Sequence, residues 1–147
     1  MKPTFLFLTL SMFTFMGFSQ EEYPVKWKQS SEAIDELTYS VQFEAQIDEP
    51  YHIYPQGANS GGMGMPTRFL FDENPNLIII GSTEEKGVEE SKSKPKSYYK
   101  KKVKFTQVVK LKEHTETTFK ATVRFMACTK QMCLLPASKE FKIILGQ

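Results

Sequence analysis

The sequence predicts an all-β protein with an immunoglobulin-like antiparallel β-sandwich. Apolar and polar residues alternate with a period of two, as in strands with one buried face, and helical periodicity is nearly absent. Roughly seven or eight strands in about 120 residues, separated by turn residues, are typical of a two-sheet sandwich. The clearest alternation is found in Tyr39–Ile47, Val103–Leu111 and Phe119–Phe125.

The remaining elements follow from shorter patterns. Within the long segments only Gln107 breaks the alternation. Charged, glycine-rich or proline-rich composition predicts irregular insertions at Gln56–Pro66 and Ser82–Lys101. Turns are predicted at Asp48–Pro50, Asp72–Pro75 and Lys112–His114, and short strands at Tyr23–Lys28, Tyr51–Tyr54, Thr67–Phe71, Leu77–Ile80 and Phe141–Leu145.

The first residues have the pattern of a signal peptide. Lys2 precedes an apolar run that is too short for a membrane span, and small residues precede Gln20. We therefore expect residues 1–19 to be removed, and residues 20–147 to form one exported domain, periplasmic or secreted, that does not span the membrane. The formal net charge of the full chain is +2, which gives no reason to expect a nucleic-acid partner.

Cys128 and Cys133 are the only cysteines in the chain. In an extended strand their Cα atoms would lie roughly 17 Å apart, whereas a disulfide needs about 4.4 to 6.8 Å. The chain must therefore turn between them if they are bonded. Continued alternation after Phe125 would place Ala127 inward, with Met126 and Cys128 on the outer face, so we expect Cys128 to be reachable by solvent.

The residues alone leave three interpretations of this pair open. A close pair in an exported chain can exchange with other thiols, or it can be an inert disulfide that closes a small loop and adds only about 2 kcal/mol of stability. A Cu(I) site is the third interpretation, because soft sulfur ligands suit that metal. Its candidate ligands are Cys128, Cys133, Met126 and Met132, with Met63 and Met65 as further contacts.

The two histidines give weaker indications. His52 is either a packed strand residue or a residue that favours a thiolate by its positive charge. His114 lies at a predicted turn, where we expect it to be inert. Neither histidine has the ligand spacing of a zinc site, and the sequence holds no Ser-His-Asp arrangement or phosphate-binding glycine loop.

Four motifs of the chain are considered together, namely Pro24–Trp27, Tyr51–Tyr54, Phe125–Cys128 and Cys133–Pro136. They resemble the amino-terminal periplasmic domain of the thiol:disulfide interchange protein DsbD, and the resemblance covers nearly all of the chain after the signal peptide. It implies an immunoglobulin-like domain that carries reducing equivalents from a membrane-embedded donor to thioredoxin-like periplasmic oxidoreductases. It also implies exchange without a cofactor.

The resemblance assigns roles to particular residues. Cys128 and Cys133 become the catalytic redox pair, with Cys133 forming the mixed disulfide and Cys128 as the resolving thiol. His52 and Tyr54 fall beside the pair, where they are candidates for tuning its redox properties. Tyr98 is the candidate for an aromatic cap over the sulfurs.

Two departures from the family pattern shape the expectation. Four residues separate the cysteines, whereas the better-known members have five. The sequence contains no membrane or thioredoxin-like part, so we expect a monomer that receives electrons from a membrane donor in trans. The direction of electron flow stays open, and a secreted immunoglobulin-like binding module with a structural disulfide remains an alternative, as does the copper protein.

Overall fold

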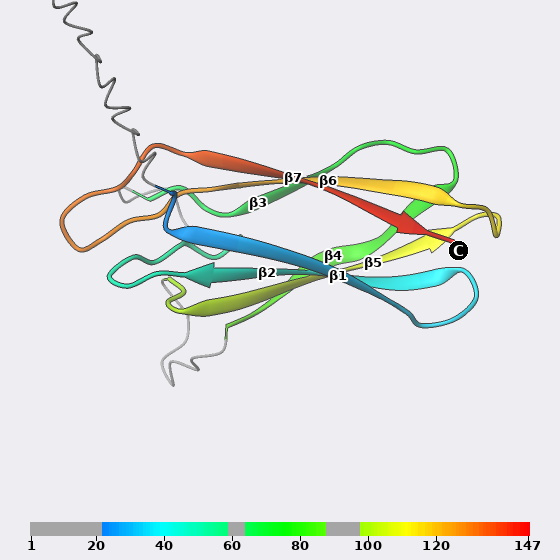
Figure 1. The fold of residues 1–147 in the computed structure, drawn as a ribbon, viewed down its shortest axis with the longest axis horizontal. Helices are drawn as coiled ribbons and strands as arrows, with labels where there is room; N and C mark the ends of the chain where they lie inside the picture. Colours follow the sequence, from blue (N-terminus) through cyan, green and yellow to red (C-terminus); the bar gives the residue numbers. More distant parts are fainter. Residues whose placement is uncertain (1–21, 59–63, 88–97) are drawn as a thin grey trace, which may run out of the picture.

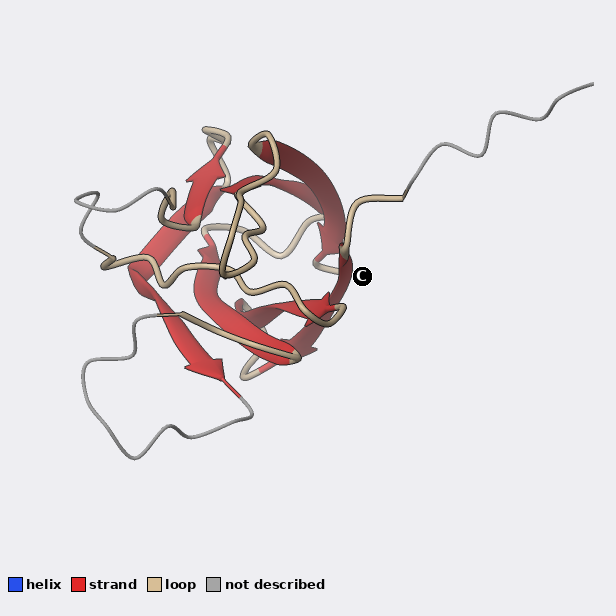
Figure 2. Cartoon of the chain, turned by 90° about the vertical axis from the view of Figure 1, so that its left-hand side faces the viewer, coloured by secondary structure: helices blue, strands red, loops and turns tan. Residues whose placement is uncertain are grey.

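The computed structural model describes residues 22–58, 64–87 and 98–147, and all regular structure within them is β (Figures 1 and 2). The sheets have the orders β1-β2-β5-β4 and β3-β6-β7, with every neighbouring pair antiparallel. This confirms the predicted sandwich. The strands are β1 (Val25–Ala33), β2 (Thr38–Ile47), β3 (Arg68–Phe71), β4 (Leu77–Gly87), β5 (Lys102–Leu111), β6 (Thr117–Phe125) and β7 (Ala137–Leu145).

The core lies between the two sheets and is formed by the apolar faces that the alternation predicted. Apolar positions of β2, β5 and β6 are buried while the residues between them face outward. Aromatic rings fill much of the space, with Trp27 in contact with four phenylalanines of both sheets. The largest fully buried apolar side chains include Phe43, Phe105, Phe119, Ile53 and Leu111.

Strand β4 is longer than its sequence suggested, so the predicted insertion at Ser82–Lys101 is wrong for residues 82–87. These residues continue β4 after a register shift between Ile80 and Glu84. The shift leaves Gly81 at a φ of +66°, a conformation that glycine adopts without steric cost. The charged residues of this segment concealed the strand in the sequence. In the structure residues 82, 84 and 86 face solvent, while residues 83, 85 and 87 are at least half covered.

Gln107 explains the register shift. Its side chain is fully buried on the inner face of β5, so the residue keeps the alternation that it was expected to break. Its amide nitrogen donates to the carbonyl of Ile80 at 2.9 Å, and its amide oxygen accepts from the hydroxyl of Thr83 at 2.8 Å. A buried polar side chain needs such partners, and the irregular part of β4 supplies them.

Three other predicted strands differ from the structure. The expected strand Tyr51–Tyr54 forms only isolated bridges, to Cys128, Tyr99 and Pro66. Strand β1 begins at Val25 and extends to Ala33, beyond its apolar residues, because it pairs along its whole length with β2. Strand β7 begins earlier than expected because it pairs with all of β6.

Some expectations concern residues that the structure does not describe. The signal peptide at residues 1–19, Met63 and the segment 88–97 lie outside the described ranges. No helix in the described part of the chain is long and apolar enough to cross a membrane.

The loops gather at the two ends of the sandwich. The cysteine segment follows β6 at one end, on the left in Figure 1, and the loops before β4 and β6 meet at the other. Strand β6 connects the two ends, and its nine residues extend over roughly 26 Å at about 3.3 Å per residue.

Candidate functional site

The two cysteines face each other across a tight hairpin. Cys128 and Cys133 form a disulfide with their Cα atoms 4.0 Å apart, as the predicted turn requires. They are paired in antiparallel register, at a position between ladder hydrogen bonds, where opposing side chains approach most closely. The flanking bonds run from the Thr129 amide to the Met132 carbonyl at 2.7 Å and from the Leu134 amide to the Ala127 carbonyl at 2.9 Å.

The turn itself is closed by Thr129. Its hydroxyl accepts hydrogen bonds from the amides of Gln131 and Met132, each at 3.2 Å. A hydroxyl side chain that satisfies backbone amides in this way stabilises a local turn. The sequence therefore holds the hairpin closed by interactions that do not depend on the disulfide.

The two sulfur-bearing residues differ in exposure, and the expectation that solvent reaches Cys128 is wrong. Cys128 is 0% exposed, whereas Cys133 is half-buried. Ala127 is buried as the alternation predicted. His52 pairs with Cys128, each residue's amide donating to the other's carbonyl at 2.9 and 3.0 Å. Strand phase alone could reveal neither this neighbouring segment nor the burial of the cysteine.

His52 lies in a small aromatic cluster beside the pair. Its ring is 4.6 Å from the Tyr98 ring and 5.4 Å from the Tyr54 ring, measured between centroids. A hydrogen bond of 3.3 Å joins its Nε2 to the Tyr54 hydroxyl. The structure thus brings His52, Tyr54 and Tyr98 together, and of the three it is His52 that pairs with Cys128.

The charge state of His52 follows from this packing. Burial lowers the pKa of His52 below 6.5, and the positive charge of Lys100 lowers it further. The imidazole is therefore neutral at neutral pH and does not supply a positive charge to a thiolate. Of the two interpretations of His52, the structure favours the packed and hydrogen-bonded one.

Tyr98 is anchored through its neighbour, Tyr99. The backbones of Tyr99 and Ile53 exchange two hydrogen bonds of 2.7 and 3.0 Å. Burial raises the pKa of Tyr99, and the nearby carboxylate of Glu85, to which its hydroxyl is bonded, raises it further. Glu85 also accepts from the amide of Gln56 at 3.0 Å. No sequence pattern indicated this anchor, because Glu85 is one of several charged residues in a segment predicted to be an irregular insertion.

A depression of about 460 Å³ lies next to the hairpin turn. Tyr98, which is 43% exposed, borders it together with His52, and the turn residue Lys130 borders it from the hairpin. Lys100, which also borders it, places its ammonium group 5.4 Å from the centre of the Tyr98 ring. The depression borders the turn of the hairpin, and neither cysteine is among its lining residues.

Tyr23 was not identified as a site residue by the sequence. Its hydroxyl accepts from the amide of Ala127 at 3.0 Å and donates to the carbonyl of Leu135 at 3.1 Å. Its ring stands edge-on to Phe125, 5.5 Å away between centroids. Because Tyr23 precedes the first strand by two residues, only the folded arrangement brings it to the base of the hairpin.

The geometry offers little for a metal in this state. Both candidate thiolates are consumed by the disulfide, and Met132 is 53% exposed. Over the described residues, no three His, Cys, Asp or Glu side chains cluster as metal ligands would. His114, the second histidine, is exposed at the turn after β5.

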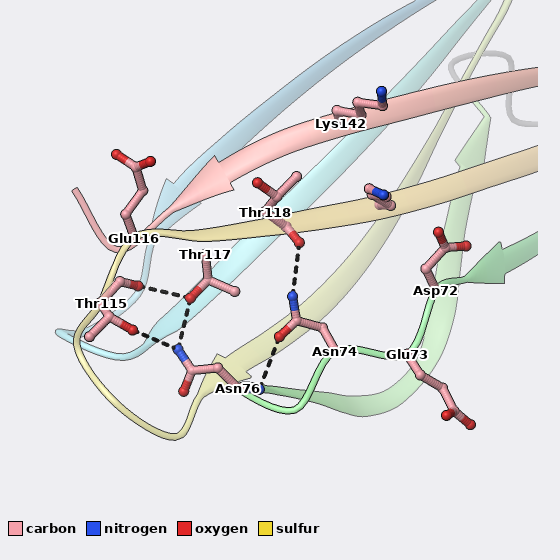
Figure 3. A pocket seen from close by; sticks show the side chains of 10 residues that line it. Asp72, Glu73, Asn74, Asn76, Thr115, Glu116, Thr117, Thr118 and Lys142 are labelled. Atoms are coloured by element: carbon pink, nitrogen blue, oxygen red, sulfur yellow. Dashed lines mark hydrogen bonds between the residues drawn. The ribbon is translucent and has the colours of Figure 1, made fainter.

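A larger depression, of about 690 Å³, lies at the opposite end of the sandwich (Figure 3). Two asparagines tie its loops together. The Asn76 amide donates to the Thr115 and Thr117 hydroxyls at 3.2 and 2.7 Å, and the Asn74 amide donates to the Thr118 carbonyl at 3.3 Å. Such a network fixes the loops around the depression.

Comparison with known proteins connects this geometry to a family. The family model described as the N-terminal domain of the thiol:disulfide interchange protein DsbD matches residues 21–145. No curated protein matches the sequence significantly.

Two solved structures are similar to the chain. The N-terminal periplasmic domain of ScsB from Proteus mirabilis has a TM-score of 0.52 and 12% identity, covering 86% of this chain and 48% of that one. The present chain thus spans about half of that structure. The reduced N-terminal domain of DsbD from Neisseria meningitidis has a TM-score of 0.35 and 15% identity, covering 78% and 82%. At 12% identity, the likeness to the ScsB domain establishes a common fold only.

Proposed function

The chain belongs to the family of DsbD N-terminal domains, and on that premise we propose that Cys128 and Cys133 carry reducing equivalents to thioredoxin-like oxidoreductases. The protein is a thiol-disulfide interchange domain with a cysteine pair at bonding distance. One observation carries the proposal furthest: the pair closes a tight hairpin in which one cysteine is fully buried and the other only half-buried.

The unequal exposure supports unequal roles in the exchange. In the dithiol form, the thiolate of Cys133 attacks the disulfide of the partner, which forms a mixed disulfide and releases one partner thiolate. The thiolate of Cys128 then attacks the sulfur of Cys133, and the second partner thiolate leaves. Two electrons pass to the partner, whose two thiolates take up the protons that the two cysteines lose, and the Cys128–Cys133 disulfide forms again.

The residues beside the pair have supporting roles in this proposal. The neutral ring of His52 and the hydroxyl of Tyr54 form a packed support behind Cys128. Tyr98 acts as the cap, because it lies against His52 at the border of the depression beside the turn. Movement of one exposed ring would then open the site to a partner.

The cellular setting is also part of the proposal. We place the chain in the periplasm, where a membrane protein reduces it and where it meets oxidised partners. The family match supports this placement, and the predicted signal peptide agrees with it.

Trapping of the mixed disulfide tests the proposal directly. The variant Cys128→Ser lacks the resolving thiol, so it should accumulate a covalent complex with a purified thioredoxin-like protein that keeps only its attacking cysteine as a mixed disulfide with a small thiol. The complex is measured on non-reducing gels and its linkage is assigned by peptide mass spectrometry.

The matched control is Cys133→Ser, which leaves only the buried cysteine. We expect at least about tenfold slower complex formation, equivalent to ~1.4 kcal/mol in the barrier. Equal trapping by both variants would contradict the assignment of Cys133, and absence of trapping by either would contradict the proposed function.

A further inference from the structure

The hairpin that carries the cysteines is bridged at its base by one side chain. The hydroxyl of Tyr23 accepts a hydrogen bond from the Ala127 amide, on the limb before the turn. It donates a hydrogen bond to the Leu135 carbonyl, on the limb after the turn. The limbs also share the bond from Leu134 to Ala127. Tyr23 therefore comes from outside the hairpin and joins both of its limbs through one hydroxyl.

The bridge has the chemistry to persist when the disulfide opens. A phenol can accept and donate at the same time only while it is protonated, and burial raises the pKa of Tyr23 above its ordinary value of 10.0. Ala127 is fully buried, so its amide would have no obvious alternative partner without the hydroxyl. Neither bond involves a sulfur atom.

We propose that Tyr23 is a positioning residue for the redox pair, and that its hydroxyl holds the two limbs of the reduced hairpin together. These two hydrogen bonds of the Tyr23 hydroxyl form a clamp. The clamp keeps Cys128 and Cys133 close in the dithiol form, which raises the effective concentration of each thiol toward the other. Clamp and disulfide favour the same closed hairpin, so by linkage each stabilises the other. The proposal rests on the exchange function of the pair and names a residue that sets its equilibrium.

The variant Tyr23→Phe removes the hydroxyl and keeps the ring. The measurement is the equilibrium of the dithiol with oxidised glutathione, which yields the protein disulfide and two molecules of reduced glutathione. We expect the equilibrium constant for forming the disulfide to fall about three- to tenfold, as expected for loss of one or two partly buried hydrogen bonds. The disulfide would become easier to reduce.

Tyr39→Phe is the matched control. The Tyr39 hydroxyl also accepts from a backbone amide, that of Gly146 at 3.2 Å, but at the other end of the sandwich. This variant should lose similar stability and leave the glutathione equilibrium unchanged. An unchanged equilibrium in Tyr23→Phe, or an equal shift in both variants, would overturn the clamp.

Hydrogen exchange in the wild-type protein gives an independent readout if Tyr23→Phe does not fold. The Ala127 amide should stay protected in both the disulfide and the dithiol forms; loss of its protection on reduction alone would show that the clamp does not persist. Failure of the parent protein to form mixed disulfides with thioredoxin-like proteins would remove the proposed function, while the glutathione equilibrium would still decide the role of Tyr23.

Discussion

The two ends of the sandwich both tie loops together, but they do so with different kinds of bond. At one end Asn76 connects the loop before β4 to the loop before β6 through side-chain hydrogen bonds (Figure 3). At the other end, which faces the viewer in Figure 2, a disulfide closes the cysteine hairpin, and two backbone hydrogen bonds join Cys128 of the hairpin to His52. The first end has the larger depression, but the second end has the disulfide, which can react with thiols.

The difference shows that cavity size does not locate the function in this fold. Hydrogen bonds between amides and hydroxyls re-form whenever they break, and they transfer no electrons to a partner protein. A disulfide is exchanged with external thiols, and the exchange needs a sulfur that an attacking thiolate can reach. Of the two sulfurs only that of the half-buried Cys133 is open to such attack, because Cys128 is fully buried, while the groups around Asn76 satisfy one another.

The largest effect that separates the two ends should come from Asn76→Ala. The variant loses three donor bonds, to Glu113, Thr115 and Thr117, and one acceptor bond from the Glu113 amide. We expect the free energy of unfolding to fall by about 2 to 4 kcal/mol, measured by urea denaturation, with no change in the glutathione equilibrium. Asn74→Ala, which loses fewer bonds, should cost less; a shifted redox equilibrium would show that the ends are coupled.

Reduction of the disulfide should cost less than the loss of Asn76. The bond closes a loop of only a few residues, so its removal should lower the free energy of unfolding by about 2 kcal/mol in the chain-entropy model. Denaturation of the oxidised protein and of Cys128→Ala/Cys133→Ala measures the difference. A loss above about 4 kcal/mol would mean that the disulfide organises the whole end of the sandwich and is a structural bond first.

Removal of the candidate cap should have a moderate kinetic effect. Tyr98→Ala opens the depression beside the hairpin, so reduction of the disulfide by a small thiol should accelerate, by up to about tenfold or ~1.4 kcal/mol in the barrier. Stopped-flow reaction with dithiothreitol measures the rate. Tyr54→Phe, which keeps a ring beside His52, is the control, and an unchanged rate in Tyr98→Ala would remove the cap role.

The smallest expected effect is a pH dependence from His52. Its pKa is lowered in the folded protein, so as pH falls below about 6.5 the unfolded chain binds a proton more readily than the folded one. Its stabilising contribution is complete above pH 6.5 and is lost as pH falls toward the folded pKa. His52→Gln should therefore show a shallower loss of stability between pH 7.5 and 5.5 than the parent.

The control for this dependence is His114→Gln, at an exposed turn away from the cluster. This variant should keep the steeper dependence of the parent protein, because carboxylates and His52 are unchanged. If both histidine variants have the same pH profile, the aromatic cluster does not hold His52 neutral.

The sequence by itself determined the fold class, the long strands and the turn between the cysteines. Alternation identified β2, β5 and β6 because antiparallel strands with one buried face have a period of two. The disulfide geometry required a turn within a five-residue separation, which the structure confirms. The family resemblance, carried by the cysteine hairpin and the His52 segment, agrees with the family match.

Tertiary structure alone decided which cysteine is buried and which residues hold the hairpin. Strand phase separates the two faces of a strand, but it does not say what lies against them, and here Cys128 is buried and pairs with the His52 segment. Tyr23 lies 104 residues before Ala127 in the chain, and no local pattern predicts so distant a contact. The redox assignment thus came from spacing and resemblance, whereas the unequal exposure of the sulfurs depends on long-range packing.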